Sequence, residues 1–181
     1  LQFKEINNYT DSYDILQSDN PKKEKFEEVL GRKCITVFTD VVKDLEEIKK
    51  LKFSELQKMD AENKKKLQSV LYEHFQYYFI PLCLTYNFSL DVENKGFKSH
   101  IIKSSSYRNL FCQIDGKKKF ILFNREQQKY LYVKNKKSQI DFWDQDLKKF
   151  PLISKSKFIE ILVSPGQMIY IPPGWWYCYE N

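Results

Sequence analysis

Histidine, the side chain most often used for metal binding and proton transfer, occurs only twice among the 181 residues of this chain. His74 lies at helical spacing with neighbouring apolar residues, so it is expected to be a partly buried helix residue. His100 is followed by two isoleucines. Neither histidine begins an H-x-D or H-x-E pair, and neither suits a Ser-His-Asp or Cys-His arrangement.

The other residues with ligand chemistry are also poorly spaced for a metal site. No two cysteines form a C-x-x-C pair, which favours buried thiols in a reducing, intracellular compartment over a zinc site. Asp141, Asp144 and Asp146 lack the glycine and terminal glutamate of an EF-hand loop, so we expect them to order a loop as hydrogen-bond acceptors. The five scattered glycines form no phosphate-binding loop.

The chain carries a net charge of +6, with lysine-rich runs at residues 64–66, 117–119 and 134–137. Such runs can contact phosphate, but acidic residues are interspersed, which favours solvated faces. A nucleic-acid-binding module is therefore an alternative that we do not favour. The 42% hydrophobic and 16% aromatic content indicates a globular protein. No run approaches eighteen apolar residues, so no membrane span is expected.

The last eighteen residues contain the most specific pattern in the chain. Pro165-Gly166 predicts a turn, and residues 168–171 predict a short buried strand. Pro172-Pro173-Gly174 ends that strand and is followed by Trp175 and Trp176, which are expected to pack in the core and at its rim.

This run resembles the Jumonji-C (JmjC) family of cupin-like domains, in which a PG-x-x-x-(Y/F)-IP-x-GWWH segment is a strand of a double-stranded β-helix. Residues 109–113 resemble the family's N-L-(F/L)-x-Q strand, and residues 138–152 resemble a family loop that wraps the barrel. The three motifs occur in family order. The resemblance therefore implies a mainly β fold with flanking helices, a double-stranded β-helix or jelly roll.

The resemblance also implies an iron site whose ligands are replaced here. Active members hold Fe(II) with two histidines and a carboxylate and bind 2-oxoglutarate. The corresponding positions are Lys103, Ser105 and Tyr177. At ~4 Å a protonated lysine repels each unit of positive charge by about 4 kcal/mol, and a hydroxyl or phenol is a poor ligand at neutral pH. We therefore expect no metal, no cofactor and no catalytic residue.

The family's 2-oxoglutarate contacts give a mixed pattern. Asn109 and Lys118 match two of them, whereas His100 stands at a position where the family has threonine or a similar residue. The alternative interpretation makes Asn109 a residue that satisfies backbone groups at a strand start and Lys118 a surface hairpin lysine. Binding of some other small anion at the barrel mouth is a further alternative.

The element pattern predicts one domain over residues 21–181 after a polar segment at residues 1–20. A helical lead-in at about 21–90 contains helices at 21–30 and about 61–75, with a strand at 34–38 between them. Barrel strands follow at about 97–181. Residues 110–114 and 118–123 are expected to form a hairpin at Asp115-Gly116, and residues 158–163 another strand. The start at Leu1 indicates a piece of a longer protein, and we expect the closing strand to be missing.

From these patterns we predict a catalytically inactive JmjC-like domain, not an enzyme, that serves as a structural or protein-binding subunit of a larger assembly. Its partners are expected to be proteins. The first alternative is an Fe(II)/2-oxoglutarate-dependent hydroxylase of protein side chains or tRNA with unusual ligands.

Overall fold

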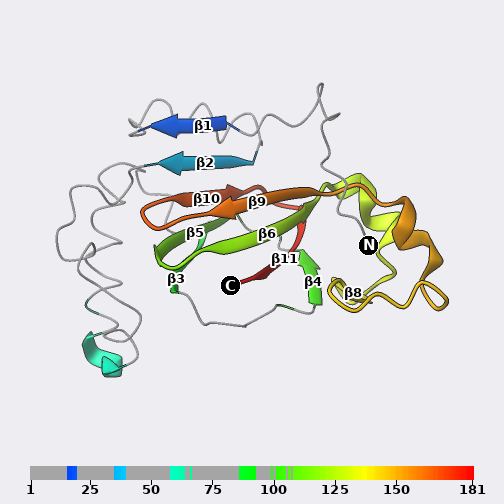
Figure 1. The fold of residues 1–181 in the computed structure, drawn as a ribbon, viewed down its shortest axis with the longest axis horizontal. Helices are drawn as coiled ribbons and strands as arrows, with labels where there is room; N and C mark the ends of the chain where they lie inside the picture. The colour runs from blue at the N-terminus through cyan, green and yellow to red at the C-terminus, as the bar shows by residue number, and fades with distance from the viewer. Residues whose placement is uncertain are drawn as a thin grey trace.

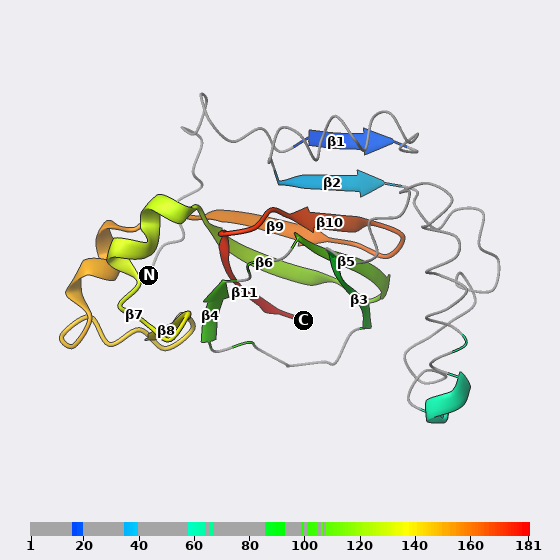
Figure 2. The same cartoon turned by 180° about the vertical axis from the view of Figure 1, so that it is seen from behind.

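The computed structural model describes residues 16–19, 35–39, 58–63, 66, 86–92, 99, 101–104, 106 and 108–181. For residues 16–19, 86–92 and 114 the backbone alone is described. Two β-sheets lie face to face in this part of the chain, as Figures 1 and 2 show from opposite sides. This arrangement is the jelly roll that the sequence predicts.

The first sheet has the order β1-β2-β10-β5-β3 within the described residues. Strands β1 and β2 run parallel, as do β3 and β5, whereas β10 is antiparallel to both of its neighbours. The bounds of the strands are Leu16–Asp19 (β1), Thr36–Thr39 (β2), Tyr86–Val92 (β3), Arg108–Asp115 (β5) and Met168–Ile171 (β10).

The second sheet has the order β7-β8-β4-β11-β6-β9 within the described residues, and all of its pairs are antiparallel. The bounds of the strands are Ile101–Ser104 (β4), Lys118–Phe123 (β6), Val133–Lys134 (β7), Lys137–Asp141 (β8), Ile159–Val163 (β9) and Trp176–Glu180 (β11).

Alternation along the strands divides the side chains of the second sheet between two cores. Phe120 and Leu122 of β6 face the barrel interior, where they pack with Tyr177 of β11 and with residues of the first sheet. Ile121 and Phe123 face the opposite side and pack in a separate cluster. The sheet is therefore buried on both faces, which explains why β6 reads as an almost continuous apolar run after its two lysines.

The segment between β6 and β9 covers the outer face of the second sheet. It contains the 3₁₀ helices η1 (Arg125–Tyr130) and η2 (Pro151–Lys155) and the β7–β8 hairpin, at the right of Figure 1. Apolar side chains of this segment are buried in the same cluster as Ile121 and Phe123. They are Leu131, Ile140, Phe142, Phe150 and Ile153. The predicted loop at 138–152 is thus partly wrong, because residues 138–141 belong to strand β8.

The strands predicted at 110–114 and 118–123 are confirmed as β5 and β6. The prediction that these two strands pair as a hairpin is wrong. Strand β5 pairs with β10 and β3, whereas β6 pairs with β11 and β9 in the other sheet. Gly116 adopts a φ of 71°, and its N–H donates to the Asp115 carboxylate at 3.0 Å. The Asp-Gly turn is real, but it carries the chain across the barrel from one sheet to the other.

Three further predicted strands are present, whereas most of the predicted helical residues lie outside the described part of the chain. The strands predicted at 34–38, 158–163 and 168–171 correspond to β2, β9 and β10. Residues 61–63 and 66 are helical, and the Asp60 carboxylate accepts a hydrogen bond from the Asn63 N–H at 2.8 Å. The predicted helix at 21–30 and the remainder of the predicted helix at about 61–75, with His74, lie outside the described residues.

Candidate functional site

Strands β4 and β11 bring two of the predicted ligand positions together inside the barrel. Lys103 and Tyr177 are directly opposite each other in the antiparallel pair. The Lys103 ammonium nitrogen lies 5.5 Å from the centroid of the Tyr177 ring, within the range of a cation–π contact. Ser105, the third predicted position, lies outside the described residues.

Lys118 is the most deeply buried charged side chain of the site. It is only 2% exposed, and its Nζ lies 4.4 Å from the centroid of the Tyr179 ring. The Nζ of Lys103 lies 6.0 Å from that centroid, so both lysines contact one aromatic ring. The interpretation of Lys118 as a surface lysine is therefore wrong, because its strand turns it into the barrel. Two lysine side chains thus lie on the inner side of this sheet beside the same ring.

Aromatic rings form the wall beside the two lysines. Phe111 of β5 lies 5.2 Å from Phe120, 5.7 Å from Tyr177 and 6.3 Å from Tyr179, measured between ring centroids. Phe120 and Tyr179 are 5.5 Å apart. A low-polarity wall strengthens the attraction between an ammonium group and an anion, because fewer water molecules screen it.

Asn109 lies two residues before Phe111 on β5 and therefore on the same face of that strand. It is 3% exposed, and it is opposite Ile171 of β10. Gln113, two residues beyond Phe111, is also buried and donates from its amide to the Asp115 carbonyl at 2.7 Å. Asn109 is thus a buried residue of the barrel wall, as both interpretations of this position require.

The side chains at the predicted ligand positions do not suit Fe(II). An ammonium nitrogen has no lone pair to donate, and Lys103 contacts the ring of Tyr177. No group of three or more His, Cys, Asp or Glu side chains in the described part of the chain could hold a metal ion. The assignment of these positions rests on the resemblance and stays a prediction.

The outer face of β11 has a different chemistry. Cys178 is a free, fully buried thiol between Tyr177 and Tyr179. Burial, followed by the negative charges of Asp141 and Glu180, raises the pKa of the Cys178 thiol far above its usual range. A thiol held neutral in this way is a core residue and a weak nucleophile.

Sequence reasoning missed several residues of the site. Tyr179 is not among the predicted site residues, although a period of two from Tyr177 places it on the same face of the strand. Phe111 enters the prediction only as part of a motif. The predicted role of the aspartates is confirmed for Asp141, which accepts from the Trp143 N–H at 2.9 Å, and for Asp146, which accepts from the N–H groups of two lysines at 3.0 and 3.1 Å.

Comparison with known protein families agrees with this architecture. The sequence model of the cupin-like domain matches residues 18–180. The chain therefore belongs to the cupin-like domain family. The match includes both sheets and the motifs that resemble the JmjC family.

Curated relatives match over a shorter segment. Human tRNA wybutosine-synthesizing protein 5 is 37% identical over 70 residues, which are 38% of this chain and 22% of that protein. The Drosophila melanogaster Jumonji C domain-containing protein 5 is 35% identical over 74 residues, 38% of this chain and 18% of that protein. Human HSPB1-associated protein 1 is 32% identical over 80 residues, 40% of this chain and 16% of that protein. The chain thus spans a minor part of the length of the curated relatives it matches.

These relatives correct one expectation. The prediction that the chain is not an enzyme is wrong, because the relatives include a protein named for the synthesis of tRNA wybutosine, an enzyme-type member of the family. The chemistry of Lys118 and of the aromatic ring beside it does not depend on the three predicted iron-ligand positions. Among the described residues, no helix has the length and apolar character of a membrane span.

Proposed function

We propose that this chain is the ligand-binding barrel of an enzyme-type cupin protein, and that its interior binds a small organic acid through Lys118 and Lys103. The observation that carries the proposal is the placement of two ammonium groups at 4.4 and 6.0 Å from one tyrosine ring. Two lysine side chains that share one aromatic ring are suited to a carboxylate, which attracts both of their positive charges.

The aromatic wall defines the kind of acid. Phe111, Phe120 and Tyr177 present apolar surface beside the ammonium groups, so a ligand with a short carbon chain between its acidic groups gains contacts at both its charged and apolar parts. A dicarboxylate matches two lysines. We propose Asn109 as a further contact, since it lies on the inner face of the same strand as Phe111. The family co-substrate 2-oxoglutarate is the natural test compound.

The test measures thermal unfolding in the presence of EDTA, with 2-oxoglutarate or succinate added. Binding at about one hundred times Kd stabilises the folded state by about 2.7 kcal/mol. For a chain of this length, that corresponds to a rise in Tm of roughly 5–10 °C. The variant Lys118→Met should lose this rise, because it keeps the apolar stem and removes the charge.

The matched control is Lys117→Met, which removes an exposed lysine beside β6 and should leave the rise unchanged. Unfolding of each variant without ligand shows whether the fold is intact. A rise in Tm that appears only when Fe(II) or Mn(II) is added would contradict the proposal, as would equal stabilisation of wild type and Lys118→Met.

We also propose that the chain contacts a protein partner in a larger assembly. Relatives from rat, cow and human are named HSPB1-associated protein 1, which supports protein association in this family. Leu147 and Leu152, in the segment that covers the second sheet, are 41% and 39% exposed. Large apolar side chains exposed on one segment are suited to a protein contact.

Crosslinking mass spectrometry on the tagged full-length protein tests this second proposal. We expect crosslinks to one defined protein, lost when Leu147 and Leu152 are both replaced by Asp. The matched control is Leu162→Asp, which changes an exposed leucine on β9. Crosslinks that persist in the double variant would place the partner elsewhere.

A further inference from the structure

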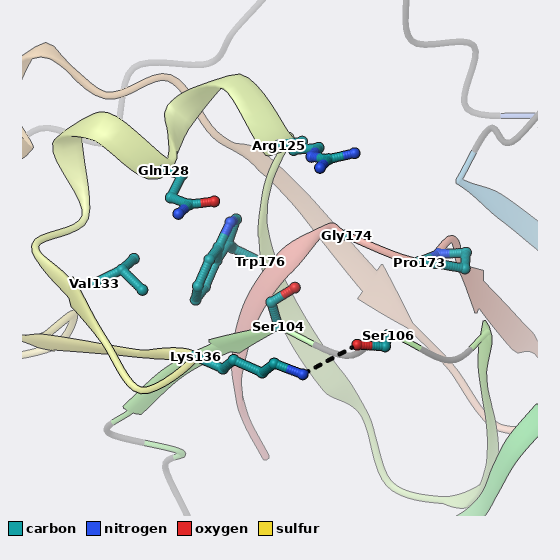
Figure 3. Close-up of a pocket in the computed structure, with 9 residues that line it drawn as sticks. All are labelled: Ser104, Ser106, Arg125, Gln128, Val133, Lys136, Pro173, Gly174 and Trp176. Atoms are coloured by element: carbon teal, nitrogen blue, oxygen red, sulfur yellow. Dashed lines mark hydrogen bonds between the residues drawn. The ribbon is translucent and has the colours of Figure 1, made fainter.

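A second hollow lies outside the barrel, against the outer face of strands β4 and β11. Its volume is about 420 Å³. Figure 3 shows nine lining residues, which come from β4 and the segment after it, from η1, from the β7–β8 hairpin, and from β11 and the turn before it. They are Ser104, Ser106, Arg125, Gln128, Val133, Lys136, Pro173, Gly174 and Trp176. Because side chains alternate along β4 and β11, this pocket and the barrel interior lie on opposite faces of one sheet.

The polar side chains around this pocket are suited to an anion. Arg125 and Lys136 supply two positive charges, and the two serines and Gln128 supply hydroxyl and amide donors. In Figure 3, Arg125 and Lys136 lie on opposite sides of the hollow. The Lys136 ammonium donates to the Ser106 hydroxyl at 3.4 Å. None of the nine lining residues is acidic, so the pocket has a positive charge of its own.

Trp176 adds an independent indication of a ligand. Its side chain is 4% exposed, and its indole N–H finds no hydrogen-bond partner in the part of the chain that the structure describes. By contrast, the indole N–H of Trp143 donates to the Ser99 carbonyl at 3.1 Å. A buried donor without an acceptor is costly, and it is rare in folded proteins. An anion oxygen in the pocket would supply the missing acceptor.

The backbone adopts an unfavourable conformation at Lys136, beside the pocket. Asn135 and Lys136 have φ values of 51° and 60° in the two-residue turn between β7 and β8. Both central residues of such a turn need positive φ, which glycine adopts most easily at the second position. A lysine there carries some strain, and backbone strain clusters at functional sites. The turn places the Lys136 side chain at the edge of the pocket.

From these contacts we propose that the pocket binds a phosphate-class oxyanion. A phosphate group has more acceptor oxygens than a carboxylate, and the pocket offers donors from several separate elements. Arg125 suits phosphate in particular, since its guanidinium donates two parallel hydrogen bonds. Val133, Pro173 and the Trp176 ring supply apolar surface for an organic group attached to the phosphate. This site is separate from the carboxylate site proposed for the barrel interior.

The test follows the indole N–H signals of the folded protein by NMR during titration with inorganic phosphate. The Trp176 signal, assigned from its loss in Trp176→Phe, should shift with saturation, whereas the Trp143 signal should stay in place. The double variant Arg125→Gln/Lys136→Gln should weaken binding at least tenfold. Trp176→Phe, which keeps a ring but removes the donor, should weaken it about threefold or more, measured by calorimetry because this variant lacks the indole signal.

The matched control is Lys134→Gln, which removes an exposed lysine of the same hairpin that does not line the pocket. Phosphate affinity in this control should stay within twofold of wild type. Lys118→Met should also leave phosphate binding unchanged, so failure of the barrel proposal and failure of this one are distinguishable.

Adenosine monophosphate in a parallel titration identifies the source of the phosphate. Tighter binding than inorganic phosphate supports a phosphate ester, and equal binding supports the free ion. An unmoved Trp176 signal, equal affinity in the double variant, or tighter binding of 2-oxoglutarate at this signal would overturn the proposal.

Discussion

The two faces of the β4–β11 strand pair differ in which elements carry their cationic side chains and in how exposed those side chains are. On the inner face, Lys103 is opposite Tyr177, and on the outer face Ser104 is opposite Trp176. The inner cations are carried by the strands themselves and are enclosed by aromatic rings. The outer cations, Arg125 among them, come from the connecting segment and are exposed to solvent.

This difference shows how one sheet can carry two separate binding chemistries. A shift of one residue in the β4–β11 register would exchange the two faces, placing Trp176 in the barrel and Tyr177 outside. The two buried cores fix the register, since Tyr177 packs in the inner cluster and Trp176 in the outer one. Each site therefore depends on both cores for its position, although its contacts lie on one side only.

The largest predicted effect tests whether the two faces of the second sheet bind their ligands independently. It comes from truncating one buried side chain on each face of β6. Phe120 packs with Phe111 and Tyr179 inside the barrel, whereas Phe123 packs with Phe142 and Phe158 outside it. Both are fully buried. Phe120→Ala and Phe123→Ala should each lower the free energy of unfolding by about 3–5 kcal/mol, measured by urea denaturation.

The ligand responses of these two variants should differ. At a temperature where both remain folded, Phe120→Ala should weaken the dicarboxylate response and leave the Trp176 indole response to phosphate unchanged. Phe123→Ala should do the reverse. If each variant impaired both responses equally, the two faces would behave as one unit.

The inner site is the part of the molecule that sequence reasoning approaches best. Strand alternation predicts that Tyr177 and Tyr179 share a face, and the family motifs point to Lys103 and Lys118. The strands themselves could be predicted because their apolar runs are short and bounded by turn residues such as Pro165-Gly166. What the pattern could not show is which sheet each strand joins. An Asp-Gly turn between apolar runs favours a hairpin, whereas here it connects strands of different sheets.

The outer pocket could not be predicted from the sequence, because its residues come from four places in the chain. Arg125, Gln128 and Lys136 read as ordinary polar residues of a connecting segment. Their proximity depends on how that segment packs against Trp176, which is tertiary information. The Asn-Lys pair at 135–136 was a missed signal, since it occupies a two-residue hairpin turn.

A smaller effect follows from the buried thiol on the outer face. The unfolded chain loses the Cys178 proton above about pH 8.5, whereas the folded chain keeps it because its pKa is raised. This contribution to stability is present below that pH and is lost as pH rises. Between pH 8.5 and 10.5 the free energy of unfolding should fall by about 1.4 kcal/mol per pH unit more in wild type than in Cys178→Ala. Urea denaturation at several pH values measures both slopes, and equal slopes would mean that the thiol titrates alike in both states.

The smallest predicted effect concerns the charged pair beside the same thiol. Lys119 and Glu180 are directly opposite on β6 and β11 and form an ion pair with side chains 27% and 20% exposed. Partly exposed pairs of this kind contribute little, because water and salt screen them. A double-mutant cycle with Lys119→Met and Glu180→Gln should give a coupling energy of about 0.5 kcal/mol that decreases as salt is raised. A coupling above about 2 kcal/mol would mean that this pair, and not the apolar clusters, holds the register that separates the two faces.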